Sequence, residues 1–72
     1  MAGGSIVRMI YYGTNGVPWW RCVIVAEPDP SKAAALIGRS ELVGFDEEVQ
    51  AIGNISEDVI ERLGLKPGEW TL

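Results

Sequence analysis

The stretch that decides the fold is residues 19–37, which read WWRCVIVAEPDPSKAAALI. Residues 19–26 are rich in aromatic and β-branched side chains, which favours a strand. Two prolines in residues 27–30 predict a rigid turn. Good helix formers fill residues 32–39, so a short helix is expected there. The stretch therefore predicts a strand, a turn and a helix in direct succession.

The start of this helix has a specific capping signature. Asp29 fits the N-cap and Pro30 the first helical position, and Ser31 is the competing cap. An apolar stripe on the expected helix would face a sheet. Its members are Ala33, Leu36 and Ile37.

The segments around this stretch supply further strands. Residues 6–12 read as a strand, joined to the strand at 19–26 by a turn around Asn15-Gly16, a strong hairpin signal. Residues 49–55 alternate as a third strand, and Ser56 caps a second helix that Gly64 ends. The chain then turns at residues 66–69, with Pro67 and Gly68 in type II positions. Residues 70–72 are expected to form a short edge strand or a packed tail.

The expected order is β-β-α-β-α, with a final short β possible. It predicts an α+β domain of two layers, in which one main helix covers one face of an antiparallel or mixed sheet of three or four strands. Residues 1–72 form a single domain, and residues 1–5 are expected to be a flexible start.

Alternation along the strands predicts which side chains face the core. The wholly apolar set in the second strand is Trp20, Cys22, Ile24 and Ala26. We expect this set to be buried, with Cys22 as a structural thiol, together with Val7, Met9 and Tyr11 of the first strand and Val49 and Ala51 of the third. The opposite, outer face then holds Ile6, Arg8, Ile10, Tyr12, Trp19, Arg21, Val23 and Val25.

This outer face is too apolar for contact with water. Contiguous exposed apolar patches of more than a few hundred Å² are rare in monomers. The face is expected to be an interface, with a partner or with a second copy, or else to be covered by the C-terminal tail or the second helix.

The residue types argue against catalysis. The chain has no His and a single Cys, so dyads with His, His-based metal sites, thiolate zinc sites and CxxC chemistry are impossible. No phosphate-binding glycine motif is present. We therefore expect no catalytic residue, no metal and no cofactor.

The single cysteine and the lack of a signal peptide or a long apolar run predict a cytoplasmic protein that does not enter a membrane. The net charge of −4 argues against direct nucleic-acid binding, because that needs clustered Lys and Arg. Glu57 and Asp58 suit a helix start. Asp46, Glu47 and Glu48 have no such local explanation, and they predict a negative patch for a basic partner.

Tyr12, Trp19 and Arg21 are the other candidate contacts, because Tyr, Trp and Arg dominate the energetics of protein interfaces. The leading hypothesis is a non-enzymatic module that binds a host protein or complex. Two alternatives are a protein that sequesters a small ligand or nucleotide, by stacking on Trp19 or Tyr12 and pairing phosphate with Arg21, and a self-assembling homodimer joined through the outer sheet face.

The layout of residues 21–26, then 28–34, then a strand that ends in Ala51-Ile52-Gly53, resembles that of very small phage-encoded proteins. Inhibitors of bacterial defence, such as the anti-CRISPR class, are similar in size, acidity and compact α+β form. The resemblance covers about half of the chain and implies that the protein acts by blocking a partner, with no catalytic residues.

Overall fold

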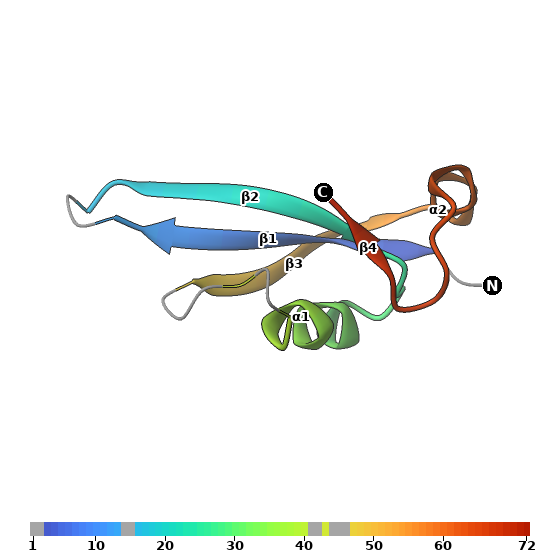
Figure 1. Ribbon diagram of the computed structural model, residues 1–72, viewed down its shortest axis with the longest axis horizontal. Helices are drawn as coiled ribbons and strands as arrows, with labels where there is room; N and C mark the ends of the chain where they lie inside the picture. The colour runs from blue at the N-terminus through green and yellow to red at the C-terminus, as the bar shows by residue number, and fades with distance from the viewer. Residues whose placement is uncertain (1–2, 14–15, 41–42, 44–46) are drawn as a thin grey trace.

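The computed structural model describes residues 3–13, 16–40, 43 and 47–72. The elements follow the predicted order, and the final short strand is present (Figure 1). They are β1 (Gly4–Tyr12), β2 (Pro18–Val25), α1 (Pro30–Gly38), β3 (Glu48–Ile55), α2 (Glu57–Leu63) and β4 (Trp70–Thr71). The predicted α+β class with one main helix on one face of the sheet is confirmed.

The four strands form one antiparallel sheet in the order β3-β1-β2-β4. The central strand β1 pairs with β2 from Ser5 opposite Val25 to Tyr12 opposite Pro18. On its other side β1 pairs with β3, with a bulge at Ile52. The short β4 pairs only with the end of β2. Most of the outer edge of β2 therefore has no strand beside it among the described residues.

The core lies between the sheet and α1. Its fully buried side chains come from β1, β2 and α1, and burial of each large aliphatic side chain contributes about 1.5–3 kcal/mol. They are Val7, Met9, Val23, Val25, Ala33 and Ile37, with Leu36, Val43 and Val49 packed against them. The hydroxyl of Ser5, which is also buried, donates to the carbonyl oxygen of Glu27 at 2.7 Å.

The predicted start of α1 is confirmed. The Asp29 carboxylate accepts from the backbone N–H groups of Ser31 and Lys32 at 2.9 and 3.4 Å, and Pro30 opens the helix. At the other end, the Arg39 backbone N–H and the Arg39 Nε both donate to the carbonyl oxygen of Ala35, at 3.2 and 3.3 Å.

The predicted turn after α2 is also confirmed. The backbone N–H of Glu69 donates to the carbonyl oxygen of Lys66 at 2.9 Å, which closes the turn. Gly68 has a φ of +85°, as the third residue of a type II turn requires. This turn brings β4 back alongside β2.

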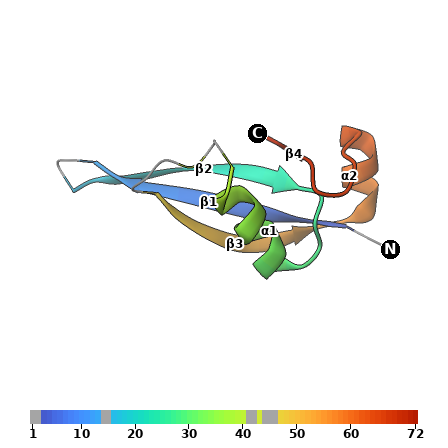
Figure 2. The ribbon, with the colours of Figure 1, turned by 60° about the horizontal axis from the view of Figure 1, so that its bottom comes forward.

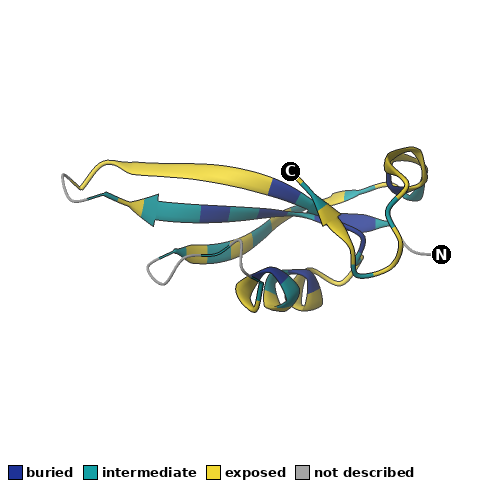
Figure 3. Cartoon of the chain, in the orientation of Figure 1, coloured by how far each residue is buried: buried dark blue, intermediate teal, exposed yellow. Residues whose placement is uncertain are grey.

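The predicted faces of β2 are wrong. The register places Val23 opposite Val7 and Val25 opposite Ser5, so the odd-numbered residues of β2 face α1. Trp20 lies on the opposite face and is 58% exposed, and Cys22 on the same face is exposed too. Much of β2 is coloured as exposed in Figure 3. Val23 and Val25 pack with Ala33 and Ile37 in the core, whereas the Trp20 side chain lies on the face that points away from α1.

Gly4 and Ser5 are expected in a flexible start, but both belong to β1 and both are buried. The C-terminal segment does not cover the face of the sheet that α1 leaves open. It joins the sheet as β4, and α2 lies at the end where β1 begins, away from α1 (Figures 1 and 2).

The molecule is elongated, with extents of 42 × 18 × 18 Å and a radius of gyration of 12.4 Å. A compact chain of this length would have a radius of gyration of about 11 Å. The additional length comes from the hairpin of β1 and β2, which extends past α1 (Figure 2). In the described residues neither helix has the length and apolar character needed to cross a bilayer.

Candidate functional site

The candidate site lies on the projecting end of the hairpin, on the face that α1 covers further along. Tyr11 and Trp19 are cross-strand neighbours there, and Arg21 is the next residue of β2 on the same face. Glu47, just before β3, completes the group. These four residues, which we call the hairpin patch, line a shallow hollow of about 250 Å³.

The hairpin patch is held together by two contacts. The rings of Tyr11 and Trp19 meet edge to face, with centroids 5.6 Å apart and an angle of 73° between the planes. The Arg21 Nη2 and the Glu47 Oε1 form an ion pair at 3.1 Å. The Arg21 side chain is 41% exposed and that of Glu47 only 10%, so Glu47 anchors a guanidinium that is still accessible.

The structure brings together three of the predicted contact residues, namely Trp19, Arg21 and Glu47. Tyr11 was expected in the core, but it lies in the hairpin patch because α1 does not extend this far. Its position directly across a predicted hairpin from Trp19 is the signal that could have identified it.

The other predicted contacts lie elsewhere. Tyr12 pairs with Pro18 and Glu48 pairs with Ile10, which puts both on the open face of the sheet, opposite the hairpin patch. Asp46 lies outside the described residues. The predicted acidic group is therefore divided, with Glu47 on one face and Glu48 on the other.

The open face carries an apolar strip with one cation at its centre. Its larger members alternate along β1 and β2, and two of them, Tyr12 and Trp20, are more than half exposed. The strip consists of Ile6, Ile10, Tyr12, Trp20, Cys22 and Ile24. Arg8 lies opposite Cys22, and its Nη2 donates to the Oε1 of Gln50 at 2.9 Å. The expected sharing of one face by Arg8 and Arg21 is wrong.

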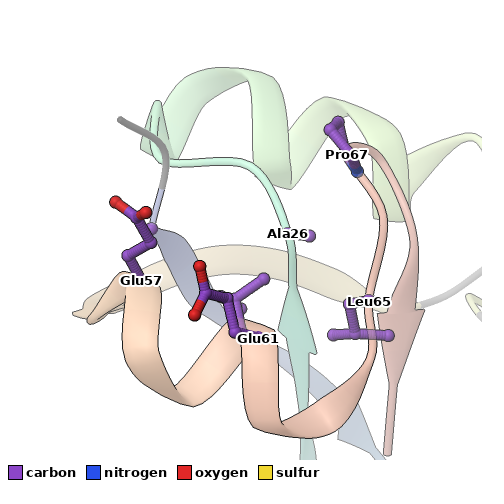
Figure 4. A pocket seen from close by; sticks show the side chains of 7 residues that line it. Ala26, Glu57, Glu61, Leu65 and Pro67 are labelled. Carbon is purple, nitrogen blue, oxygen red and sulfur yellow. The ribbon is translucent and has the colours of Figure 1, made fainter.

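A second hollow, of about 180 Å³, lies between α2, the end of β2 and the turn before β4 (Figure 4). The carboxylates of Glu57 and Glu61 stand at its rim, and Ala26, Leu65 and Pro67 form much of its wall. Its lining includes no basic side chain, so it is unsuited to a phosphate-bearing ligand. The hairpin patch is the better place to consider such a ligand.

In the part of the chain that the structure describes, no three His, Cys, Asp or Glu side chains come together as metal ligands. The hairpin patch offers aromatic faces, a guanidinium and a carboxylate. These groups suit recognition by stacking and charge-assisted hydrogen bonds.

Comparison of the chain with protein-family models, curated proteins and solved structures finds no match.

Proposed function

We propose that this chain is a non-enzymatic protein-binding module that blocks a host protein or protein complex through the hairpin patch. A small inhibitor encoded by a phage or another mobile element would act in this way. The observation that carries the proposal is the exposure of Trp19. This large apolar side chain is 58% accessible to solvent, although the protein has a hydrophobic core. A hairpin that extends past its helix presents this side chain to a partner.

The composition of the hairpin patch supports a protein partner. Trp, Tyr and Arg are the residues that most often dominate interface energetics. The contact between Tyr11 and Trp19 and the ion pair of Arg21 with Glu47 hold these side chains before binding, which lowers the entropic cost of association.

The same geometry argues against the nucleotide alternative. A phosphate that approached Arg21 would meet the Glu47 carboxylate at 3.1 Å from the same guanidinium. The like charge would oppose binding. An acidic side chain of a protein partner is opposed too, so the exposed aromatic faces of the patch are expected to provide most of the affinity.

The test is affinity capture with the purified chain, followed by measurement of the dissociation constant of any captured partner. Trp19→Ala is expected to weaken binding by about 2 kcal/mol, or roughly thirtyfold, as for an interface hot spot. Leu63→Ala is the matched control, because Leu63 on α2 is 44% exposed and lies far from the patch. Equal affinities of the two variants would exclude the hairpin patch as the site.

Native mass spectrometry of the chain purified from its host distinguishes the nucleotide alternative. The proposed module is expected to carry no nucleotide. A retained nucleotide that is lost in Arg21→Ala would overturn the proposal in favour of sequestration.

A further inference from the structure

We propose that two copies of this chain pair through the outer edge of β2, in antiparallel orientation about a two-fold axis at Trp20, to form one continuous sheet of eight strands. The inference goes beyond the proposed function, because it concerns a backbone edge rather than the hairpin patch. It also differs from a dimer joined through a sheet face.

The backbone of β2 presents unused hydrogen-bonding groups at this edge. Beyond the end of β2, the N–H of Ala26 donates to the Glu69 carbonyl at 2.8 Å, and the carbonyl of Ala26 accepts from Gly68 at 3.0 Å. Backbone groups alternate between the two edges of a strand, so the groups of the even-numbered residues point to the outer edge. Because β4 pairs only with Ile24 and Val25, the groups of Pro18, Trp20 and Cys22 have no strand beside them in the described chain.

These three residues are spaced symmetrically about Trp20. An antiparallel pairing of two copies that uses all of them must place Trp20 opposite the partner's Trp20 and Cys22 opposite the partner's Pro18. Pro18 has a carbonyl but no N–H, so it can only accept, as suits the first residue of a strand. The register then provides four backbone hydrogen bonds, two at the centre and one at each end.

The side chains are complementary in the same register. On the open face the two Trp20 rings lie side by side. On the face of the hairpin patch, Trp19 lies opposite the partner's Arg21, and the pair recurs on the other side of the axis. Aromatic pairs and a guanidinium on an indole are favourable cross-strand contacts. No like charges face each other directly across the axis.

The other edge of the sheet has more of the features that prevent such pairing than the edge of β2, where Pro18 and Arg21 are the only ones among the described residues. Strand β3 presents exposed Glu48, Gln50 and Asn54 and has a bulge at Ile52. Charges and bulges are the usual protection of an edge strand. The free part of β2 has no bulge in its pairing with β1 and no proline after its first residue.

Helix α1 does not obstruct a second copy at this edge. Helix α1 packs over β1 and β3, away from the edge of β2 (Figures 1 and 2). A two-fold axis perpendicular to the sheet puts both α1 helices on the same side and far apart. Both copies of the hairpin patch then adjoin the axis on that side, which gives a partner two adjacent sites.

Sedimentation equilibrium under reducing conditions tests the pairing with a matched pair of variants at one position. Cys22→Pro removes an N–H that points away from β1, whereas Cys22→Ala removes the same thiol and keeps that N–H. Wild type and Cys22→Ala are expected to dimerise, and Cys22→Pro to remain monomeric with an unchanged circular dichroism spectrum. A wild-type chain that stays monomeric at the highest soluble concentration would overturn the proposal, and so would a dimer of unchanged affinity in Cys22→Pro.

Opposite charges introduced at position 20 in two variants test the register without a proline substitution. In the proposed register, residue 20 lies opposite residue 20 of the second copy. Trp20→Lys alone and Trp20→Glu alone are therefore each expected to raise the dimer dissociation constant about tenfold, because like charges then face each other. A mixture of the two variants should form a heterodimer. If mixing restores no association, the register is wrong. A wild-type chain that binds a protein partner but stays monomeric would refute this inference and leave the proposed function intact.

Discussion

At the scale of single residues, Trp19 and Trp20 give one strand two different surfaces. They are adjacent in sequence and equally exposed, at 58% each, yet they lie on opposite faces of the sheet. Trp19 belongs to the hairpin patch, and Trp20 stands on the open face at the proposed two-fold axis. A substitution at Trp20 should therefore affect the proposed dimer and leave the hairpin patch intact, whereas a substitution at Trp19 also removes its contact with the partner's Arg21.

The room for a Cβ atom differs between Gly4 and Gly38, and this difference predicts how alanine at each position changes stability. A Cβ at position 4 would collide with the backbone carbonyl oxygen of Val25 and approach the Cδ1 of Ile60 to 2.6 Å, whereas a Cβ at position 38, in α1, would meet nothing within 4 Å. We expect Gly4→Ala to lower the free energy of unfolding by about 1–3 kcal/mol. Gly38→Ala should raise it by about 0.5–1 kcal/mol, because alanine favours the helix.

Urea unfolding of the two variants beside the wild type measures both changes. Shifts of the unfolding midpoint in opposite directions are expected. A Gly4→Ala variant as stable as the wild type would show that the Val25 carbonyl and the Ile60 side chain can both move away from the start of β1 at no cost.

The residues also show where sequence reasoning succeeds. Val7 and Met9 are buried as predicted, because they lie in the central strand under the helix. Trp20 and Cys22 are exposed against prediction. The wholly apolar set of β2 is predicted to be the core set, but the structure buries Val23 and Val25 of the other set. Alternation separates the two faces of a strand, but it does not reveal which of them a helix covers.

At the scale of elements, the two helices differ in how they begin. The Asp29 side chain accepts two backbone hydrogen bonds at the start of α1, whereas Ser56 at the start of α2 makes no side-chain cap bond. Asp29→Ala is therefore expected to cost about 1 kcal/mol of stability, and Ser56→Ala close to none. Thermal unfolding followed by circular dichroism compares the two, and equal losses would contradict the assigned caps.

The elements themselves were largely predictable, because their signals are local. A helix cap is determined by Asp29 and Pro30, and a turn by Pro67 and Gly68. A strand is determined by the alternation that begins at Val49. The candidate site was less predictable, because the contact of Arg21 with Glu47 spans 26 positions and depends on strand order. Sequence alone named both residues, but it placed Tyr11 in the core and Tyr12 beside Trp19.

At the scale of the whole molecule, the hairpin of β1 and β2 has two halves that differ in packing. The half under α1 contributes Val7, Val23 and Val25 to the core. The projecting half relies on backbone pairing and on the contacts of the hairpin patch. Local stability follows the density of buried apolar contacts, so it should fall along the hairpin towards its turn.

Amide hydrogen exchange measures this gradient within one strand. The N–H groups of Trp19, Val23 and Val25 all point to β1, so they differ in their distance from α1 and not in their bonding pattern. At a concentration low enough for the chain to be monomeric, we expect the amide of Trp19 to exchange about tenfold faster than those of Val23 and Val25. Equal protection at all three amides would mean that the contact of Tyr11 with Trp19 and the ion pair of Arg21 stabilise the projecting half as strongly as the core stabilises the rest. The hairpin patch would then be a structural element of the fold, and the exposure of Trp19 would no longer indicate a binding surface.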